Sequence, residues 1–225
     1  MTESKAGQGR KSIDARSRPT PARGIATIEA IVEAAERLWG AHGIEGASLR
    51  EISNAAGSAN KSSIGYHFGD KHGLIGAIFR SRIPVLEKRR QPLLAAAKAE
   101  GTLGDPLTLF RITFKPVFDE VDRYGRHSFA AFLRAVNRFP QWDARAGTQE
   151  LAPIAFFVMG VLREQVSHLP QTLFDARVRL INEICYGAIT DQDDVHQAAG
   201  ADADLPNKIF EDALSASAHL LFLDN

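Results

Sequence analysis

Residues 48–74, SLREISNAAGSANKSSIGYHFGDKHGL, contain the side chains whose types and spacing best suit a chemical task. Four consecutive small or donor-rich side chains stand in this segment: Asn60, Lys61, Ser62 and Ser63. Their amide, ammonium and hydroxyl groups can donate hydrogen bonds to phosphate oxygens or to the edges of bases. Gly65 follows, and a residue without a side chain lets a ligand approach the backbone closely. The segment therefore predicts a surface that contacts nucleic acid.

Short helices must hold these donors, and the sequence marks where the helices begin and end. Ser48 and Glu51 have the spacing of a capping box, which predicts a helix that starts just after Ser48. Gly57 supplies a turn, and Asp70 is a candidate cap for the next helix. A helix, a tight turn and a short polar second helix are what a helix-turn-helix needs to enter a major groove.

The same segment resembles the DNA-binding domain of the TetR family of bacterial regulators. The resemblance covers about residues 25–75 and rests on Ala55-Ala56-Gly57, on Tyr66-His67-Phe68, and on Lys71 two residues beyond Gly69. One difference is the distance from Gly57 to Phe68, which is about one residue longer than the commonest spacing in the family.

The resemblance implies a recognition helix at about residues 61–67, with phosphate contacts on both sides of it. Tyr66 and His67 would contact phosphates, and Lys71 would bind a phosphate beside a helix N-terminus. We expect Phe68 to lie in the core, whereas Tyr66 is balanced between core and contact. The predicted DNA-contacting residues are Ser48, Arg50, Asn60, Lys61, Ser62, Ser63, Gly65, Tyr66, His67 and Lys71.

The resemblance also implies a domain organisation and a function. A three-helix helix-turn-helix domain, residues 25–70, would precede a larger helical effector-binding and dimerisation domain, residues 71–225, in an all-α protein. A homodimer would bind a palindromic DNA operator as a repressor and would be released by a small hydrophobic or aromatic effector. Two alternatives stay within the family: an activator, and a regulator that responds to a protein partner. A helical enzyme with a basic arm is the alternative from a different class.

Composition and charge narrow the setting in which the protein works. No run of about 18 apolar residues predicts a membrane span, and no apolar segment near the N-terminus is typical of a secretory signal. Cys185 is the single cysteine, so no disulfide is expected within the chain and a reducing cytoplasm is the expected location. Residues 1–100 contain 16 basic and 10 acidic side chains, and the remainder contains 11 and 17. A basic front and an acidic rear suit a protein that places one end on a polyanion.

Residues 1–24 combine glycine, serine, proline and arginine without an apolar period, which predicts a disordered basic arm. Such an arm would follow the phosphate backbone or enter a minor groove, or it would serve only as a solubilising tail. Its basic residues are Lys5, Arg10, Lys11, Arg16, Arg18 and Arg23.

The rest of the chain has helical periodicity and no credible strand. A first helix is expected over residues 27–42, and a long helix from Lys71 toward Leu86 with a kink at Pro84. Asp105-Pro106 has the form of a cap followed by a first-turn proline. The stripe that follows runs from Leu107 to Val121 and is interrupted by Pro116.

Two further helices are expected at residues 127–139 and 150–168, and the second is apolar almost all round, which predicts a central position. The aromatic side chains of residues 107–162 are either ordinary core or, as the resemblance implies, the lining of an effector cavity. The predicted effector-binding residues are Phe110, Phe114, Phe118, Phe129, Phe132, Phe156, Phe157 and Met159.

Two last helices, at residues 171–190 and 206–223, have wide apolar faces with small residues among them. Such a pair can form a four-helix bundle with its own copy, and the resemblance places the dimer interface there. The apolar faces include Leu214 and Leu220. The alternative is that both helices only cover the core of their own chain.

The sequence supports neither catalysis nor a cofactor. The histidines, His42, His67, His72, His127, His168, His196 and His219, have no metal-ligand spacing with one another or with Cys185. Asp191, Asp193 and Asp194 resemble a calcium loop only superficially, because its glycine and terminal glutamate are missing. No glycine-rich phosphate loop or nucleophile elbow is present, so we expect no enzyme, no metal and no cofactor.

Overall fold

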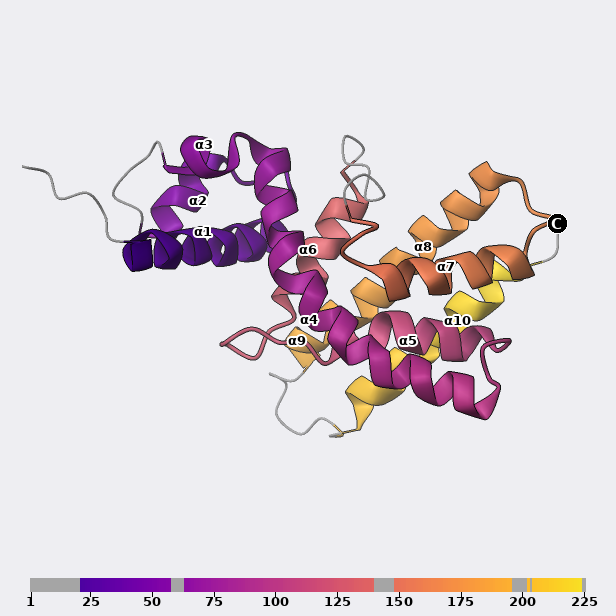
Figure 1. The fold of residues 1–225 in the computed structure, drawn as a ribbon. Helices are drawn as coiled ribbons and strands as arrows, with labels where there is room; N and C mark the ends of the chain where they lie inside the picture. Colours follow the sequence, from indigo (N-terminus) through magenta and orange to yellow (C-terminus); the bar gives the residue numbers. More distant parts are fainter. Residues whose placement is uncertain (1–20, 58–62, 140–147, 196–201, 203, 224–225) are drawn as a thin grey trace, which may run out of the picture.

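The computed structural model describes residues 21–57, 63–139, 148–195, 202 and 204–223, and every secondary-structure element in this part of the chain is a helix (Figure 1). This confirms the predicted all-α class. None of the helices within these residues combines the length and apolarity needed to cross a membrane. The elements are α1 (Pro21–His42), α2 (Leu49–Ala55), α3 (Ser63–Phe68), α4 (Lys71–Glu100), α5 (Pro106–Phe118), α6 (Ser128–Asn137), α7 (Pro153–Gln165), α8 (Gln171–Thr190), α9 (Gln192–Val195) and α10 (Leu205–Leu221).

The first three helices pack around Trp39. Ile31, Ile52 and Ile64, one from each helix, are buried in the same apolar core as Trp39, whose indole N–H donates to the Ala47 carbonyl at 3.0 Å. α1 begins at Pro21, earlier than predicted, and a proline fits the first turn of a helix. Part of the predicted arm is therefore helical, and residues 1–20 lie outside the described residues.

Local capping signals set the start of three helices, as predicted. The Ser48 backbone N–H donates to Glu51 at 2.8 Å and the Glu51 N–H donates to the Ser48 hydroxyl at 3.3 Å, which completes the capping box of α2. Asp70 accepts from the Gly73 N–H at 2.9 Å at the start of α4. Asp105 accepts from the Thr108 N–H at 3.0 Å at the start of α5.

α4 is a single helix of 30 residues that runs from the N-terminal domain into the rest of the molecule (Figure 1). It continues well beyond Leu86 to Glu100, and Gly101, whose φ of 69° suits glycine, caps its C-terminus. Pro84 and Pro92 lie inside it, and both are exposed, so solvent can reach the carbonyls that the prolines leave without a helical partner. The kink at Pro84 stays a prediction.

Two predictions about the middle of the chain are wrong. α5 ends at Phe118, so Val121 lies outside it and is 47% exposed, while Pro116 is buried within the helix. α7 is not central: Val158 and Leu162 are its only fully buried residues and Phe157 is exposed, because α7 packs on α4 and α5 with one side only. Apolar composition all round did not determine its place. α6 lies between α1 and α8 instead (Figure 1).

α8 and α10 form an antiparallel pair, with the Arg177 guanidinium near the start of α8 donating to the Leu221 carbonyl at the end of α10 at 2.8 Å (Figure 1). α8 has the predicted bounds. Most of the apolar residues assigned to a dimer face, Leu214 among them, are buried within the chain itself. The alternative interpretation, that both helices cover the core of their own chain, holds for these residues.

Cys185 of α8 is buried, its sulfur lies 3.3 Å from the Ser217 hydroxyl of α10, and burial raises the pKa of its thiol to about 12.

Candidate nucleic-acid interface

α3 is a six-residue helix fixed to the domain by its apolar residues. Ile64 is buried and Phe68 is half-buried against the core, as predicted for Phe68. Gly57, with φ of 64°, ends α2, and Gly69, with φ of 76°, separates α3 from α4. These turns require positive φ, which glycine adopts without strain. α3 therefore has a fixed inner face and an outer face that faces solvent.

The outer face of α3 presents Gly65, Tyr66 and His67. Tyr66 is 87% exposed, so it is not a core residue, and its ring lies edge-on to the His67 ring with centroids 5.0 Å apart. A Cβ on Gly65 would meet nothing within 4 Å, so this part of the helix is open to an incoming ligand. An exposed tyrosine beside an exposed histidine offers hydrogen-bond donors at the position where the sequence predicts phosphate contacts.

The two predicted contact residues at the start of α2 differ in whether a hydrogen-bond donor is available to a phosphate. Arg50 is exposed. The Ser48 hydroxyl donates to Glu51 at 2.7 Å, so the capping box already uses its proton. The hydrogen bonds from Ser48 lower the pKa of Glu51 and keep that carboxylate charged. A phosphate at this end of α2 would therefore be met by Arg50 rather than by the Ser48 hydroxyl proton.

Lys71 connects the start of α4 to the turn between α1 and α2. Its ammonium donates to the Ile44 carbonyl at 3.0 Å and to the Glu45 carboxylate at 3.0 Å. An ammonium has three donors, and the described residues accept from two of them, so the third could bind a phosphate. Three other predicted contacts lie outside the described residues, namely Asn60, Lys61 and Ser62. The side chain of Ser63 also lies outside them.

This arrangement agrees with what comparison with known proteins finds. Residues 31–78 match the family model of bacterial regulatory proteins of the tetR family. We call these residues the TetR-family domain, after the family model that they match. A stretch of 69 residues is 38% identical to the HTH-type transcriptional repressor AcnR of Corynebacterium glutamicum, and it covers 31% of this chain and 34% of AcnR. The chain thus matches about a third of the length of that curated relative.

A solved structure of a protein assigned to the TetR-family transcriptional regulators, from Mesorhizobium loti, also resembles the chain. The two are 16% identical, the match covers 88% of this chain and 98% of that chain, and the TM-score is 0.43.

The TetR-family domain is joined to the rest of the molecule by a buried carboxylate. Glu36 of α1 is 1% exposed and accepts from Arg82 of α4 through Nε at 2.6 Å and Nη2 at 3.1 Å. It also accepts from the Ser128 hydroxyl of α6 at 2.6 Å. The apolar stripe of α1 did not predict this role for Glu36, although a glutamate that interrupts such a stripe between Ala35 and Trp39 is a signal for a buried carboxylate.

α1 and α6 also approach each other closely. A Cβ on Gly40 would lie 2.9 Å from the Ala131 Cβ and 3.2 Å from the backbone of α6, so glycine is required there. Beyond this point a hollow of about 570 Å³ separates the end of α1 and the following turn from α6 and Thr190. None of the predicted effector-binding residues lines this hollow.

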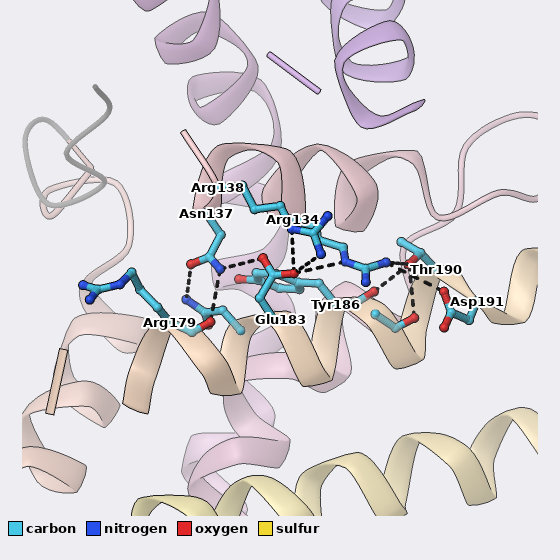
Figure 2. Close-up of polar contacts among 10 residues, drawn as sticks. Arg134, Asn137, Arg138, Arg179, Glu183, Tyr186, Thr190 and Asp191 are labelled. Carbon is cyan, nitrogen blue, oxygen red and sulfur yellow. Dashed lines mark hydrogen bonds and ion pairs between the residues drawn. The ribbon is translucent and has the colours of Figure 1, made fainter. Parts of the chain in front are cut away.

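A polar cluster behind the hollow joins α6 to α8, and Figure 2 shows Arg134, Asn137 and Arg138 converging on Glu183. Arg138 Nε donates to Glu183 at 2.8 Å, Asn137 at 2.9 Å and Arg134 Nε at 3.3 Å. Burial alone would raise the pKa of Glu183, but these hydrogen bonds and charges outweigh it and lower the pKa. α6 therefore connects the TetR-family domain on one side with α8 on the other.

The structure does not gather the predicted effector-binding residues into one site. Phe110, Phe114 and Met159 line a small cavity with Leu162, Phe174 and Ile181, and its volume is about 20 Å³. Phe118 stacks on Phe210, and Phe129 and Phe132 pack with Phe79 in the core below α1. Phe156 is partly buried, and Phe157 is exposed beneath the Lys98 ammonium. Residues that share one helical face are expected to be buried together, but this pattern does not predict which other helix the face packs against.

Proposed function

We propose that the protein is a transcriptional regulator that binds a palindromic DNA operator as a homodimer. One observation carries this proposal: α3 exposes Gly65, Tyr66 and His67 while Ile64 and Phe68 fix it within a TetR-family domain. We propose repression as the mode of action, in keeping with the name of AcnR as a repressor. Activation is the second candidate, because the same surface would serve both.

The proposed dimer uses the solvent-facing sides of α8 and α10 rather than their buried faces. Leu180 of α8 and Leu223 just after α10 are each 54% exposed, and Phe222 is 39% exposed. Large apolar side chains in solvent at these helices favour burial against a second copy. The dimer would present two α3 helices, and binding to adjacent half-sites requires them to lie about 34 Å apart.

For the effector we propose a small hydrophobic or aromatic molecule that enters between α5, α7 and α8. The apolar cavity there already contains Phe110, Phe114 and Met159, and Thr113 and Asn182 add two polar groups to its lining. Its volume of about 20 Å³ holds roughly one water molecule, so the helices must separate before an effector fits. Release of DNA then follows if the effector binds the separated form better than the closed form, while the operator binds the closed form better.

The decisive experiment selects double-stranded DNA from a random-sequence pool with the purified protein. We expect a palindrome to be enriched and to shift in a gel with the wild type. Tyr66→Ala should reduce its affinity about tenfold without loss of stability, because the side chain is exposed. Phe68→Ala serves as the matched control, which should lose stability. A pool with no enriched sequence would reject the proposal and favour the alternative of a helical enzyme.

A further inference from the structure

The segment between α5 and α6, residues 119–127, contacts the TetR-family domain and α4 at the same time. Arg123 pairs with Glu33 of α1 at 3.2 Å. Glu120 pairs with Arg89 at 2.6 Å and with Arg82 at 3.6 Å, both on α4. Ser128, the next residue after this segment, donates to the buried Glu36 of α1. The position of this segment therefore bears directly on how the TetR-family domain is held.

His127 fixes the end of this segment. Its Nδ1 lies 2.6 Å from the Asp193 carboxylate of α9, and its Nε2 lies 3.0 Å from the Phe118 carbonyl at the end of α5. Its backbone N–H also donates to Asp193 at 3.0 Å. His127 is 9% exposed, so solvent hardly replaces these partners. Since a carboxylate and a carbonyl can only accept, both ring nitrogens must donate, and only the protonated imidazolium does so.

The charges around the ring favour the protonated form. Burial alone would lower the pKa of His127, but the hydrogen bond and charge of Asp193, the Phe118 carbonyl and the charge of Asp122 outweigh it and raise the pKa. Lys115 at the end of α5 is paired with Asp119, and its ammonium lies over the Phe118 ring. His127 is thus fully protonated below the ordinary imidazole pKa of about 6.5, and it loses its proton as the pH rises through its raised pKa.

We propose that His127 is a pH-sensitive latch that controls how firmly the TetR-family domain is held for DNA binding. This inference rests on the proposed function. A neutral imidazole can donate to only one partner, so either α9 or the end of α5 is released from residues 119–128. Ser128 and Arg123 then hold α1 less firmly. A domain with more freedom of orientation loses more on binding DNA, so operator affinity falls as the pH rises.

The test uses the palindrome that the wild-type protein itself selects at pH 6, and it measures affinity at pH 6 and pH 9. His127→Gln has one amide nitrogen in place of two ring nitrogens, so it cannot donate to Asp193 and to the Phe118 carbonyl as the ring does, and Asp193→Asn removes the charge with little change in shape. Relative to the wild type, both variants should bind roughly fivefold more weakly at pH 6 and equally well at pH 9. His168→Gln, which replaces an exposed histidine, is the matched control and should follow the wild type at both pH values.

The outcomes separate the two proposals. Parallel pH profiles for the wild type and His127→Gln would overturn the latch and leave the proposed function intact. If His127→Gln does not fold at pH 9, Asp193→Asn decides, and a wild-type profile for that variant also overturns the latch. A wild-type protein that selects no DNA sequence would overturn both.

Discussion

Lys71 combines an observed structural role with the role in DNA binding that we propose for it. Two of its ammonium protons bind the Ile44 carbonyl and the Glu45 carboxylate, so it positions the turn before α2. The third has no acceptor among the described residues, and we propose a phosphate for it. The TetR-family resemblance predicts only the phosphate role, because the partners at residues 44 and 45 lie 27 and 26 positions away in the chain.

We predict that Lys71→Ala weakens binding to all DNA sequences alike and lowers the slope of log affinity against log salt by roughly one unit. The reason is that one phosphate contact disappears, with no loss of base recognition. Fluorescence anisotropy over a salt series measures both quantities. Glu45→Gln removes the ion pair but keeps the ammonium, so it should leave the slope unchanged. An equal loss in both variants would make Lys71 a purely structural residue.

At the scale of helices, sequence reasoning succeeded where a signal is local. Ser48, Asp70 and Asp105 each bond to backbone N–H groups two or three residues later, so they mark the starts of α2, α4 and α5 without knowledge of the fold. The place of α7 and the partners of Phe118 and Phe157 depend on which helix packs against which. A single periodic stripe does not contain that information. Leu214 is an example: its apolar stripe predicts burial, but the residue is buried within its own chain rather than against a second copy.

The exposed face of α8 provides a prediction about assembly. Leu180→Glu should give a monomer that remains folded, since the side chain is 54% exposed within one chain. Leu214→Ala should instead lower the free energy of unfolding by about 2–5 kcal/mol, because it leaves a cavity in the core. Sedimentation together with urea unfolding distinguishes the two effects. Ser167→Glu, at an exposed turn, is the control for added charge, and a dimeric Leu180→Glu would move the interface elsewhere.

The stability that the contact between α6 and α8 contributes should depend on pH. The folded-state pKa of Glu183 is lowered, so its contribution to stability is present above the unfolded value of about 4.3 and is lost as the pH falls through the folded value. Glu183→Gln should therefore be less stable than the wild type at pH 7, by about 1 kcal/mol, and the difference should close near pH 3. Urea unfolding at both pH values measures this. Glu164→Gln, which replaces an exposed carboxylate, should show no such closing difference.

At the scale of the whole molecule, α4 is the covalent path from the TetR-family domain to the helices that surround the proposed effector site (Figure 1). Buried Glu87 on this helix accepts from the Ile154 N–H of α7 at 2.8 Å, and Arg90 donates to the Thr113 carbonyl of α5 at 3.0 Å. We expect these hydrogen bonds to transmit a movement of α5 or α7 to α4. Arg82, two turns before Arg90, then acts on Glu36 of α1.

Pro84 lies between these two sets of contacts. Pro84→Ala restores a backbone donor within α4, and we predict that it changes the coupling between effector and operator by on the order of 1 kcal/mol while effector affinity changes modestly. Operator titrations with and without effector measure the coupling. Pro92→Ala is the matched control, because this exposed proline of α4 does not lie between Arg82 and the pair Glu87 and Arg90. Equal coupling in Pro84→Ala and the wild type would make the proline an accommodated irregularity.

The buried thiol of Cys185 has a practical consequence for spectroscopy. It is the only cysteine in the chain, and with a pKa of about 12 it forms almost no thiolate at neutral pH. A cysteine introduced at the exposed Ser81 of α4 would therefore react with a maleimide spin label well before the native one. Pulsed dipolar measurements could then follow the separation of two labelled chains during titration, in a protein that keeps its natural core.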